Sequence, residues 1–365
     1  MRFASLGHDV FLVDSLIKRF WEAEVGASPL EAIPSLKARC QLWNETQKNK
    51  ISHFIGDISK SPRFIYKIVE DVKPDVVIHY AEQPSAPYSM INRETCLSTH
   101  SNNVDGTLNL VFALKKYVPD CHIIKLGTMG EYGTPNIDIE EGWLEIEHKG
   151  RKGKFLFPRA AGSIYHTTKV MDTDLMWFGV RMWDLRVTDL MQGPVYGIET
   201  EEAAIDPRLN TIFNYDEVFG TIVNRFIVQA VVDYPLTVYG KGGQTRGYLN
   251  IKDTLQCVHH SEKAPAAKGE LRIFNQIMET FSANQLADMV QRVGQSLGYG
   301  VQVNHLENPR KEAEEHYYNP TYQGLIELGV KPHYLTDEVM AGMFKVVEKY
   351  KDNIRKDVIF KGIKW

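Results

Sequence analysis

Short apolar runs alternate with longer segments of helical spacing along the first half of the chain. Five apolar runs predict strands, at 10–14, 51–55, 76–79, 122–126 and 184–190. Segments that place apolar residues every three or four positions predict helices at 63–73, 103–117 and 164–178. Because strands that alternate with helices form parallel sheets with right-handed crossovers, we predict an α/β fold with a Rossmann-like, doubly wound parallel sheet.

This alternation loosens after residue 196. We predict helices there at 219–232, 282–297 and 338–350, and short strands at 236–239 and 272–275. The pattern favours a smaller, mixed α/β lobe on the C-terminal edge of the sheet. We therefore expect a dinucleotide-binding domain at 1–195 and a mainly substrate-binding lobe at 196–365, with about 247–278 returning to the first domain.

The apolar run 10–14 ends in Asp14 and reads as a buried parallel strand. In a dinucleotide-binding unit such a strand is the second one, after a first strand, a glycine-rich turn and a helix, all within ~30 residues. No strand followed by GxxGxxG occurs in the sequence. We expect the first strand and glycine-rich loop to be missing, and we favour a start codon chosen too far downstream over a true truncation. An upstream extension could also contain an organellar transit peptide.

Composition narrows the function classes. The 365 residues carry a formal net charge of −4, which offers no broad basic field for nucleic acid or an anionic membrane. No apolar run reaches the ~18 residues that a membrane helix needs. The four cysteines lack the spacing of a zinc site. We therefore expect a cytoplasmic protein with no metal, no nucleic-acid partner and no membrane partner.

Tyr165 and Lys169 form a YxxxK motif, which places both side chains on one face of the predicted helix. The spacing alone is a weak signal, because a chain with 17 tyrosines gives about one such match by chance. Tyr248 with Lys252 is a second match, which we interpret as structural. Tyr165 differs because it follows a strand ending at Thr128, whose hydroxyl would face a ligand at the carboxyl edge of the sheet.

This arrangement predicts that Tyr165 is a base. A free tyrosine has a pKa near 10 and is ionised to about one part in a thousand at neutral pH. A close, partly desolvated Lys169 ammonium would lower that pKa, so that Tyr165 could take the proton of a sugar hydroxyl. Thr128 would hydrogen-bond the same oxygen. The alternative is a surface helix with a solvated lysine.

Longer strings of residues resemble one enzyme family. Thr128, Tyr165 and Lys169 match the catalytic triad of extended short-chain dehydrogenases/reductases. Segments that are similar to signatures of the UDP-sulfoquinovose synthases are 85–90, 125–136, 240–249 and 312–318. The similarity covers nearly the whole chain. It separates this sequence from nucleotide-sugar 4,6-dehydratases, which have Asp-Glu directly after the threonine, where Met129 and Gly130 stand here.

The resemblance implies a reaction between UDP-glucose and sulfite. Carbon 4 is oxidised by bound NAD, water is lost across carbons 5 and 6, sulfite adds at carbon 6, and the retained NADH reduces carbon 4 again. The elimination needs an acid/base group, for which Glu131 is our candidate, with Met129 as an apolar wall of the pocket. Many family members have arginine where this chain has Pro84; if that arginine holds sulfite or substrate, another cation must do so here.

Two alternatives to this function stay open: another UDP-sugar epimerase or dehydratase on the same scaffold, and an inactive, truncated chain. The expected partners are UDP-glucose and sulfite, or a protein that donates sulfite. Relatives are often dimers through two helices beside the sheet, so we expect a homodimer.

Cofactor and substrate contacts follow from the fold and the resemblance. An acid at the tip of the second strand can accept both ribose hydroxyls, which favours NAD over its 2′-phosphorylated relative. The expected cofactor-binding residues are Asp14, Ser15, Arg19, Asp57, Ile58, Ala81, Asn102, Asn103, Tyr165, Lys169 and Val195. The expected substrate-binding residues are Thr128, Met129, Gln192, Arg225, Thr237, Tyr239, Gln244, Arg246 and Arg310.

Overall fold

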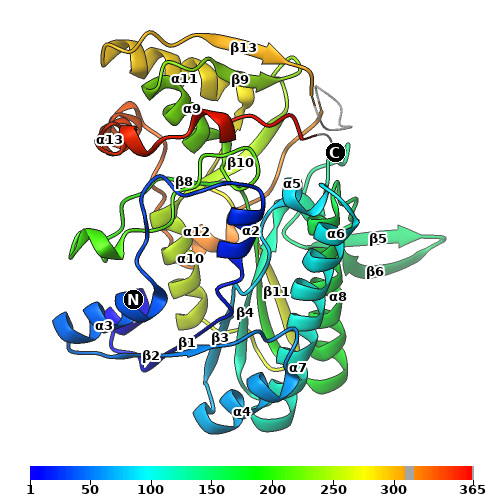
Figure 1. The fold of residues 1–365 in the computed structure, drawn as a ribbon. Coiled ribbons are helices and arrows are strands. Elements are labelled where there is room, and N and C mark those ends of the chain that lie inside the picture. Colours follow the sequence, from blue (N-terminus) through cyan, green and yellow to red (C-terminus); the bar gives the residue numbers. More distant parts are fainter. Residues whose placement is uncertain (309–315, 364–365) are drawn as a thin grey trace.

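The computed structural model describes residues 1–308 and 316–363, which form an α/β fold around a parallel sheet (Figure 1). Four parallel strands lie in the order β11-β7-β4-β3. Their bounds are Val76–His79 for β3, His122–Thr128 for β4, Arg186–Gln192 for β7 and Glu270–Gln276 for β11. The predicted strands 76–79, 122–126, 184–190 and 272–275 are thereby confirmed, with ends that differ by up to two residues.

Helices cover both faces of this sheet. Successive side chains of β4 point to opposite faces, so neighbouring residues of this strand pack against different helices. Ile123 packs in a cluster with Leu110 of α7 (Gly106–Tyr117) and Met176 of α8 (Ile164–Trp183). Its neighbour Ile124 packs in a different cluster with Cys257 of α10 (Ile251–Lys263). The central strand is therefore buried on both sides.

The strands β1 (Val10–Asp14) and β2 (Ile51–Ile55) form a separate parallel pair, as their sequences predict. Within the residues that the structure describes, no ladder joins β1 to β3. The expectation of a buried strand at 10–14 is wrong, because Phe11 is 44% exposed. β1 pairs on one edge only, so much of its surface meets solvent.

The helices near this pair are mostly where apolar spacing predicts them. The predicted helix 63–73 is α4 (Pro62–Val72), and the polar stretch before β2 contains α2 (Lys18–Glu24) and α3 (Leu36–Thr46). The predicted start of helix 103–117 is wrong. Helix α6 (Arg93–His100) runs through a π-helical turn (Ser101–Asp105) directly into α7, and the polar sequence of α6 hides it from a search for apolar spacing. Short helices are α1 (Arg2–Ser5), α5 (Ala86–Ser89) and α12 (Gly324–Glu327).

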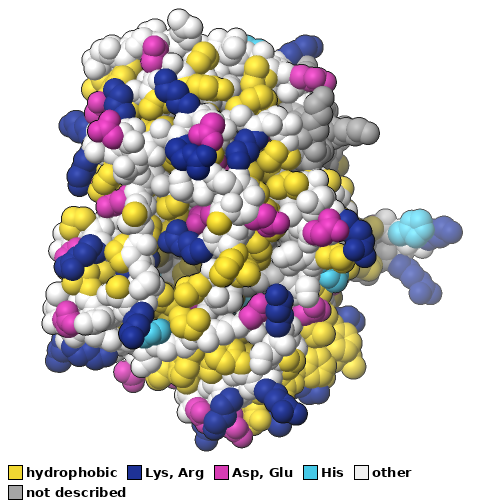
Figure 2. All heavy atoms as spheres, viewed as in Figure 1, with side chains coloured by type: hydrophobic (Ala, Val, Ile, Leu, Met, Phe, Trp, Pro, Cys, Tyr) yellow, Lys and Arg dark blue, Asp and Glu magenta, His cyan; other side chains and the backbone are white. Residues whose placement is uncertain are grey.

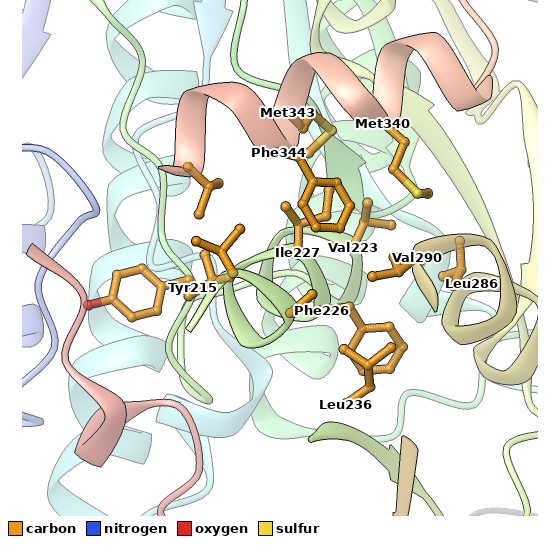
Figure 3. Close-up of a cluster of buried hydrophobic side chains, with 14 of the residues drawn as sticks. Tyr215, Val223, Phe226, Ile227, Leu236, Leu286, Val290, Met340, Met343 and Phe344 are labelled. Atoms are coloured by element: carbon orange, nitrogen blue, oxygen red, sulfur yellow. The ribbon is translucent and has the colours of Figure 1, made fainter. Parts of the chain in front are cut away.

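The second lobe, at the top of Figure 1, has its own core. Its helices are α9 (Ile222–Val231), α11 (Ala283–Ser296) and α13 (Asp337–Lys349). Its strand pairs are β9 (Leu236–Tyr239) with β13 (Val303–Leu306), and β10 (Thr245–Asn250) with β8 (Val195–Tyr196) and β12 (Glu279–Ser282). Figure 3 shows Phe226 of α9, Leu286 of α11 and Phe344 of α13 converging on this core. The helix and strand predictions for this region are confirmed to within three residues.

A hairpin that the sequence analysis missed projects from the body (Figure 1). It consists of β5 (Trp143–His148) and β6 (Arg151–Leu156), paired antiparallel. Lys149 and Gly150 form its tip, and both have positive φ (50° and 74°), as a tight two-residue hairpin turn requires. The hairpin is anchored where Trp143 meets Trp177 of α8, with ring centroids 5.0 Å apart.

No helix in residues 1–308 and 316–363 is both long and apolar enough to cross a lipid bilayer.

Candidate functional site

The candidate site lies where the parallel strands end. Thr128 and Gln192 close β4 and β7 and are register partners across that ladder. After Thr128 the chain turns through a short 3₁₀ helix, Met129–Glu131, and the Thr128 hydroxyl accepts a hydrogen bond from the Gly130 N–H at 3.2 Å. The carboxyl edge of a parallel sheet is where such folds bind ligands.

Helix α8 begins beside this turn. Ser163 caps the helix by accepting from the His166 N–H, and the Tyr165 N–H donates to the Ser89 hydroxyl at 3.0 Å. These bonds fix the first turn of α8, so Tyr165 and Lys169 project from successive turns of one face. Both side chains are buried, which excludes the alternative of a surface helix with a solvated lysine.

Lys169 is engaged by carboxylates in the structure. Its ammonium forms an ion pair with Glu82, and the Asp172 carboxylate lies 3.6 Å away. Although burial lowers the Lys169 pKa, these two anions raise it above its ordinary value. The ammonium is thus charged but already neutralised.

The expectation that Lys169 lowers the pKa of Tyr165 is therefore not met in this structure. Burial raises the Tyr165 pKa, and the charges of Glu82 and Glu131 raise it further. A desolvated phenol ionises only where a net positive charge faces it. Here the Lys169 ammonium is shared by two carboxylates.

The Glu131 carboxylate lies inside the protein and not at the surface of a pocket. It is fully buried, 3.6 Å from the Lys125 ammonium and 3.5 Å from Arg159 Nε. The Thr173 hydroxyl of α8 lies 3.1 Å from Glu131 and 2.7 Å from Asp189, so its single proton serves one of the two carboxylates at a time, and Lys125 donates to both Thr173 and Asp189. Burial raises the pKa of Glu131. This geometry anchors the carboxylate inside the protein, so its role as acid or base at the substrate stays a prediction.

His166 is a site residue that the sequence analysis missed. Its imidazole lies against Gly130, where a Cβ atom would collide with the ring, and its ring centroid is 5.2 Å from that of Tyr165. The side chain is only partly buried. A histidine inside the YxxxK motif was the available signal, because imidazole is the side chain best suited to proton transfer near neutral pH.

The candidate residues for the adenosine side of the cofactor lie at the ends of β1 and β2. Asp14 accepts from the Leu16 N–H at 2.6 Å, and Asp57 accepts from the N–H and hydroxyl of Ser59. Ser15 accepts weakly from the Ile17 N–H, and Arg19 pairs with Glu22 at 3.1 Å. These contacts leave the carboxylates at the carboxyl ends of adjacent parallel strands, which fits a bound ribose and adenine.

Of the remaining cofactor candidates, Asn102 and Asn103 form hydrogen bonds inside the protein, and Ala81, Ile58 and Val195 have apolar side chains. Asn103 is fully buried: its amide oxygen accepts from the Gln83 N–H at 2.8 Å and its amide nitrogen donates to the Thr168 hydroxyl at 3.0 Å. It ties the loop after β3 to α8, and Asn102 donates to it. Ala81 is exposed just after β3, Ile58 is buried after β2, and Val195 lies in β8.

The candidate substrate residues come mostly from the second lobe. Arg225 is buried in α9 with its guanidinium 5.7 Å from the Tyr239 ring centroid, and its Nε has no hydrogen-bond partner in the part of the chain that the structure describes. Gln244 donates to the Tyr239 carbonyl at 3.0 Å. Thr237 is already bonded to Gln229 through both its hydroxyl and its N–H. The structure therefore brings Arg225, Tyr239 and Gln244 together, and gives Thr237 an internal partner.

Two further substrate candidates, Gln192 and Arg246, contact neighbouring side chains. Gln192 bonds to Gln276 at 3.0 Å, and Arg246 lies 2.9 Å from His316 Nε2. Met129 is 6% exposed and belongs to the apolar cluster that contains Met176 of α8, and its place in the pocket wall stays a prediction. Arg310 lies outside the described residues.

Comparisons with known proteins agree with this geometry. The NAD dependent epimerase/dehydratase family matches residues 2–275. UDP-sulfoquinovose synthase from the chloroplast of Spinacia oleracea is 46% identical over 358 residues, covering 98% of this chain and 74% of that protein. UDP-sulfoquinovose synthase from Sulfolobus acidocaldarius is 42% identical over 368 residues, covering 100% of this chain and 93% of that protein.

Solved structures support the fold. The UDP-glucose 4-epimerase of Thermotoga maritima, solved with UDP-glucose, aligns with a TM-score of 0.68 at 18% identity, covering 94% of this chain and 92% of that one. The UDP-glucuronic acid 4-epimerase of Bacillus cereus, solved with UDP-glucuronic acid and NAD, aligns with a TM-score of 0.67 at 17% identity, covering 94% and 99%. Given the family match and the two close relatives, the chain belongs to the NAD dependent epimerase/dehydratase family and, within it, to the UDP-sulfoquinovose synthases.

Proposed function

We propose that this chain converts UDP-glucose and sulfite to UDP-sulfoquinovose, with Tyr165, Lys169 and Thr128 at the reacting carbon 4. The observation that carries the assignment of residues is the placement of the buried Tyr165–Lys169 pair at the start of α8, beside the turn that follows Thr128. The two close relatives supply the reaction class.

Each residue has one task in this proposal. Tyr165 takes the proton of the sugar's 4-hydroxyl and later returns it. Thr128 hydrogen-bonds the same oxygen and holds it toward the phenol. Lys169 supplies the positive charge on which a phenolate depends. NAD, when bound, supplies the hydride acceptor and donor at carbon 4.

Two side chains compete for the acid/base work of the elimination at carbons 5 and 6. Glu131 is fully buried and paired with cations, so it would need a shift of the turn to meet a sugar. His166 is partly exposed and lies against the same turn. We keep Glu131 as the proposal from the sequence, and its geometry makes His166 the second candidate.

The cofactor proposal is NAD held by Asp14, Asp57 and the start of α8. Its pyrophosphate needs backbone N–H groups at a helix N-terminus, and no glycine-rich turn joins a strand to a helix beside Asp14 in the described residues. Titration of these 365 residues with NAD tests this proposal.

We further propose a homodimer through the helices beside the sheet. Apolar side chains are exposed on three neighbouring helices, and Figure 2 shows a hydrophobic patch over the α7 and α8 region at the lower right. The exposed residues are Leu97 of α6, Leu108 and Phe112 of α7, and Met171, Phe178 and Met182 of α8. Contiguous apolar patches of this kind mark protein interfaces.

The experiment that tests the function supplies the protein with UDP-glucose, NAD and sulfite and seeks a sulfonated nucleotide sugar by mass spectrometry. Tyr165→Phe should abolish the product. Tyr248→Phe is the matched control, because Tyr248 belongs to the other YxxxK match and lies in β10 of the second lobe. UDP-galactose or a 4-keto sugar, formed whether or not sulfite is present, would instead indicate an epimerase or a dehydratase.

A further inference from the structure

Two buried carboxylates face the Lys169 ammonium, and the proposed reaction gives neither of them a task. Glu82 lies in the segment after β3 and forms an ion pair with Lys169. Asp172, one turn further along α8, lies 3.6 Å from the same ammonium. The three side chains are between 0 and 2% exposed, so water screens none of these interactions.

The carboxylates have spare acceptor capacity. Within residues 1–308 and 316–363, Glu82 Oε1 and both oxygens of Asp172 are buried without a hydrogen-bond partner. The His79 imidazole lies 3.9 Å from Glu82 Oε1 but bonds to the Thr107 hydroxyl at 2.9 Å. Burial lowers the His79 pKa to about 4, with a contribution from Lys169, so this ring is neutral at physiological pH. Lys169 is therefore the cation that both carboxylates share.

Other charged groups near Tyr165 are already balanced against one another. Lys125 of β4 pairs with Asp189 at 3.1 Å and with Glu131 at 3.6 Å, and Glu131 also faces Arg159. The charged groups that act on Tyr165 or Lys169 from the packed elements are Glu82 after β3, Lys125 of β4, Glu131 in the turn after β4 and Asp172 of α8, and Lys169 in turn acts on His79. After burial, the charge of Glu82 raises the pKa of Tyr165 most, and Glu82 is also the ion-pair partner of Lys169.

We propose that Glu82 is a positioning residue of the Tyr165–Lys169 pair, whose carboxylate holds and neutralises the ammonium so that Tyr165 remains a phenol in the cofactor-free protein. This inference rests on the proposed roles of Tyr165 and Lys169. It matters because one tyrosine must act as a base when carbon 4 is oxidised and as an acid when carbon 4 is reduced. An unopposed ammonium would hold the phenolate and make the return of the proton harder. Glu82 moderates that charge.

The test follows ionisation of Tyr165 directly, in the protein without cofactor. Phenolate absorbs near 295 nm, and subtracting the pH titration of Tyr165→Phe from that of the unmodified protein isolates this one side chain. We expect no ionisation of Tyr165 below about pH 10, the ordinary tyrosine value. In the Glu82→Gln background, the same subtraction should show ionisation lower by one pH unit or more, because Asp172 keeps Lys169 charged while one opposing anion is gone.

Two variants control the experiment. Glu82→Asp keeps the charge and should restore most of the original titration. Glu141→Gln is the matched control: Glu141 is a half-buried carboxylate that accepts from the N–H groups of Asn275 and Gly324, each at 3.1 Å, and its replacement should leave the Tyr165 titration unchanged. Far-ultraviolet circular dichroism checks that each variant is folded. In turnover, Glu82→Gln should move the acid limb of the kcat profile to lower pH with little change in KM.

The outcomes distinguish a failure of the inference about Glu82 from a failure of the proposed function. An unchanged Tyr165 titration in folded Glu82→Gln overturns the inference, and so does a shift that Glu141→Gln reproduces. Full activity of Tyr165→Phe overturns the proposed function instead. An inactive Tyr165→Phe together with a shifted titration in Glu82→Gln supports both.

Discussion

Replacing Lys125 tests how much the buried ion pairs beneath the site stabilise the protein. The side chain is 0% exposed in the middle of β4. It donates to Asp189 at 3.1 and 3.3 Å and to the Thr173 hydroxyl at 2.9 Å, and lies 3.6 Å from Glu131. Lys125→Met keeps most of the volume but removes the charge that two fully buried carboxylates share.

The expected cost comes from the anions left behind. Removing one partner of a buried ion pair destabilises a protein by about 3–5 kcal/mol, because the other charge stays buried and uncompensated. Arg159 still faces Glu131, and Thr173 still donates to Asp189 at 2.7 Å, so the lower end of that range applies. At ~2 °C for each kcal/mol in a large domain, the melting temperature should fall by roughly 6 °C.

The loss should depend on pH with a definite sign. Burial raises the pKa of Glu131, and without Lys125 it should rise further. A carboxyl with a raised folded-state pKa is stabilising below its unfolded value near 4 and loses that contribution as pH rises through the folded value. The stability difference between Lys125→Met and the unmodified protein should therefore be largest at neutral pH and shrink toward pH 5.

Urea unfolding at pH 7.5 and pH 5.5, followed by circular dichroism, measures both effects. Lys152→Met is the control, because its side chain is 80% exposed on the hairpin and its pair with Glu147 is a surface pair. Such a pair contributes at most about 1 kcal/mol. A loss below about 1 kcal/mol in Lys125→Met, or an equal loss at both pH values, would refute the reasoning.

Three further predictions follow from separate features. Gly133→Ala should lower the melting temperature by the equivalent of at least about 1 kcal/mol, because φ at this position is +67° and a Cβ would overlap the Ala160 carbonyl. Gly342→Ala is the control: a Cβ at this position in α13 meets no described atom within 4 Å, so the melting temperature should rise slightly. Phe178→Glu should shift the protein toward monomer in light scattering after gel filtration; an unchanged mass would remove this face from the dimer. Because Glu131 is the proposed acid/base group of the elimination, His166→Phe should leave the yield of sulfonated product nearly normal; loss of that product with oxidation of carbon 4 retained, read as NADH absorbance, would transfer the elimination to His166.

Local sequence predicted the strands of the central sheet and most of the longer helices. The apolar runs of β3, β4 and β7 are long enough to mark strands that are covered by helices, and α4, α9 and α11 show strong apolar spacing. Among the features that the sequence did not predict, three have a clear physical reason. The polar sequence of α6 has no apolar stripe, β1 lost its expected burial because β2 is its only described ladder partner, and the β5–β6 hairpin packs little of its surface on the body.

The sequence also predicted which residue types form the candidate site, but it did not predict the ion pairs that surround them. A YxxxK spacing places Tyr165 and Lys169 on one helix face whatever surrounds them. Whether the ammonium is free to act on the phenol depends on Glu82, which is 87 residues away in sequence from Lys169 and reaches it only when the segment after β3 lies beside α8. Likewise, Glu131 is a plausible loop acid in the sequence and a buried ion-pair partner in the fold.

The amino-acid sequence by itself determined the family, the order of strands and helices, and the identity of the tyrosine, lysine and threonine, because these depend on local spacing and on long matching strings. Only the tertiary structure decided burial, charge balance and which polar groups are already satisfied. Those properties arise from residues distant in sequence that share a low-dielectric interior, where a carboxylate a few ångströms away outweighs any preference of the local segment.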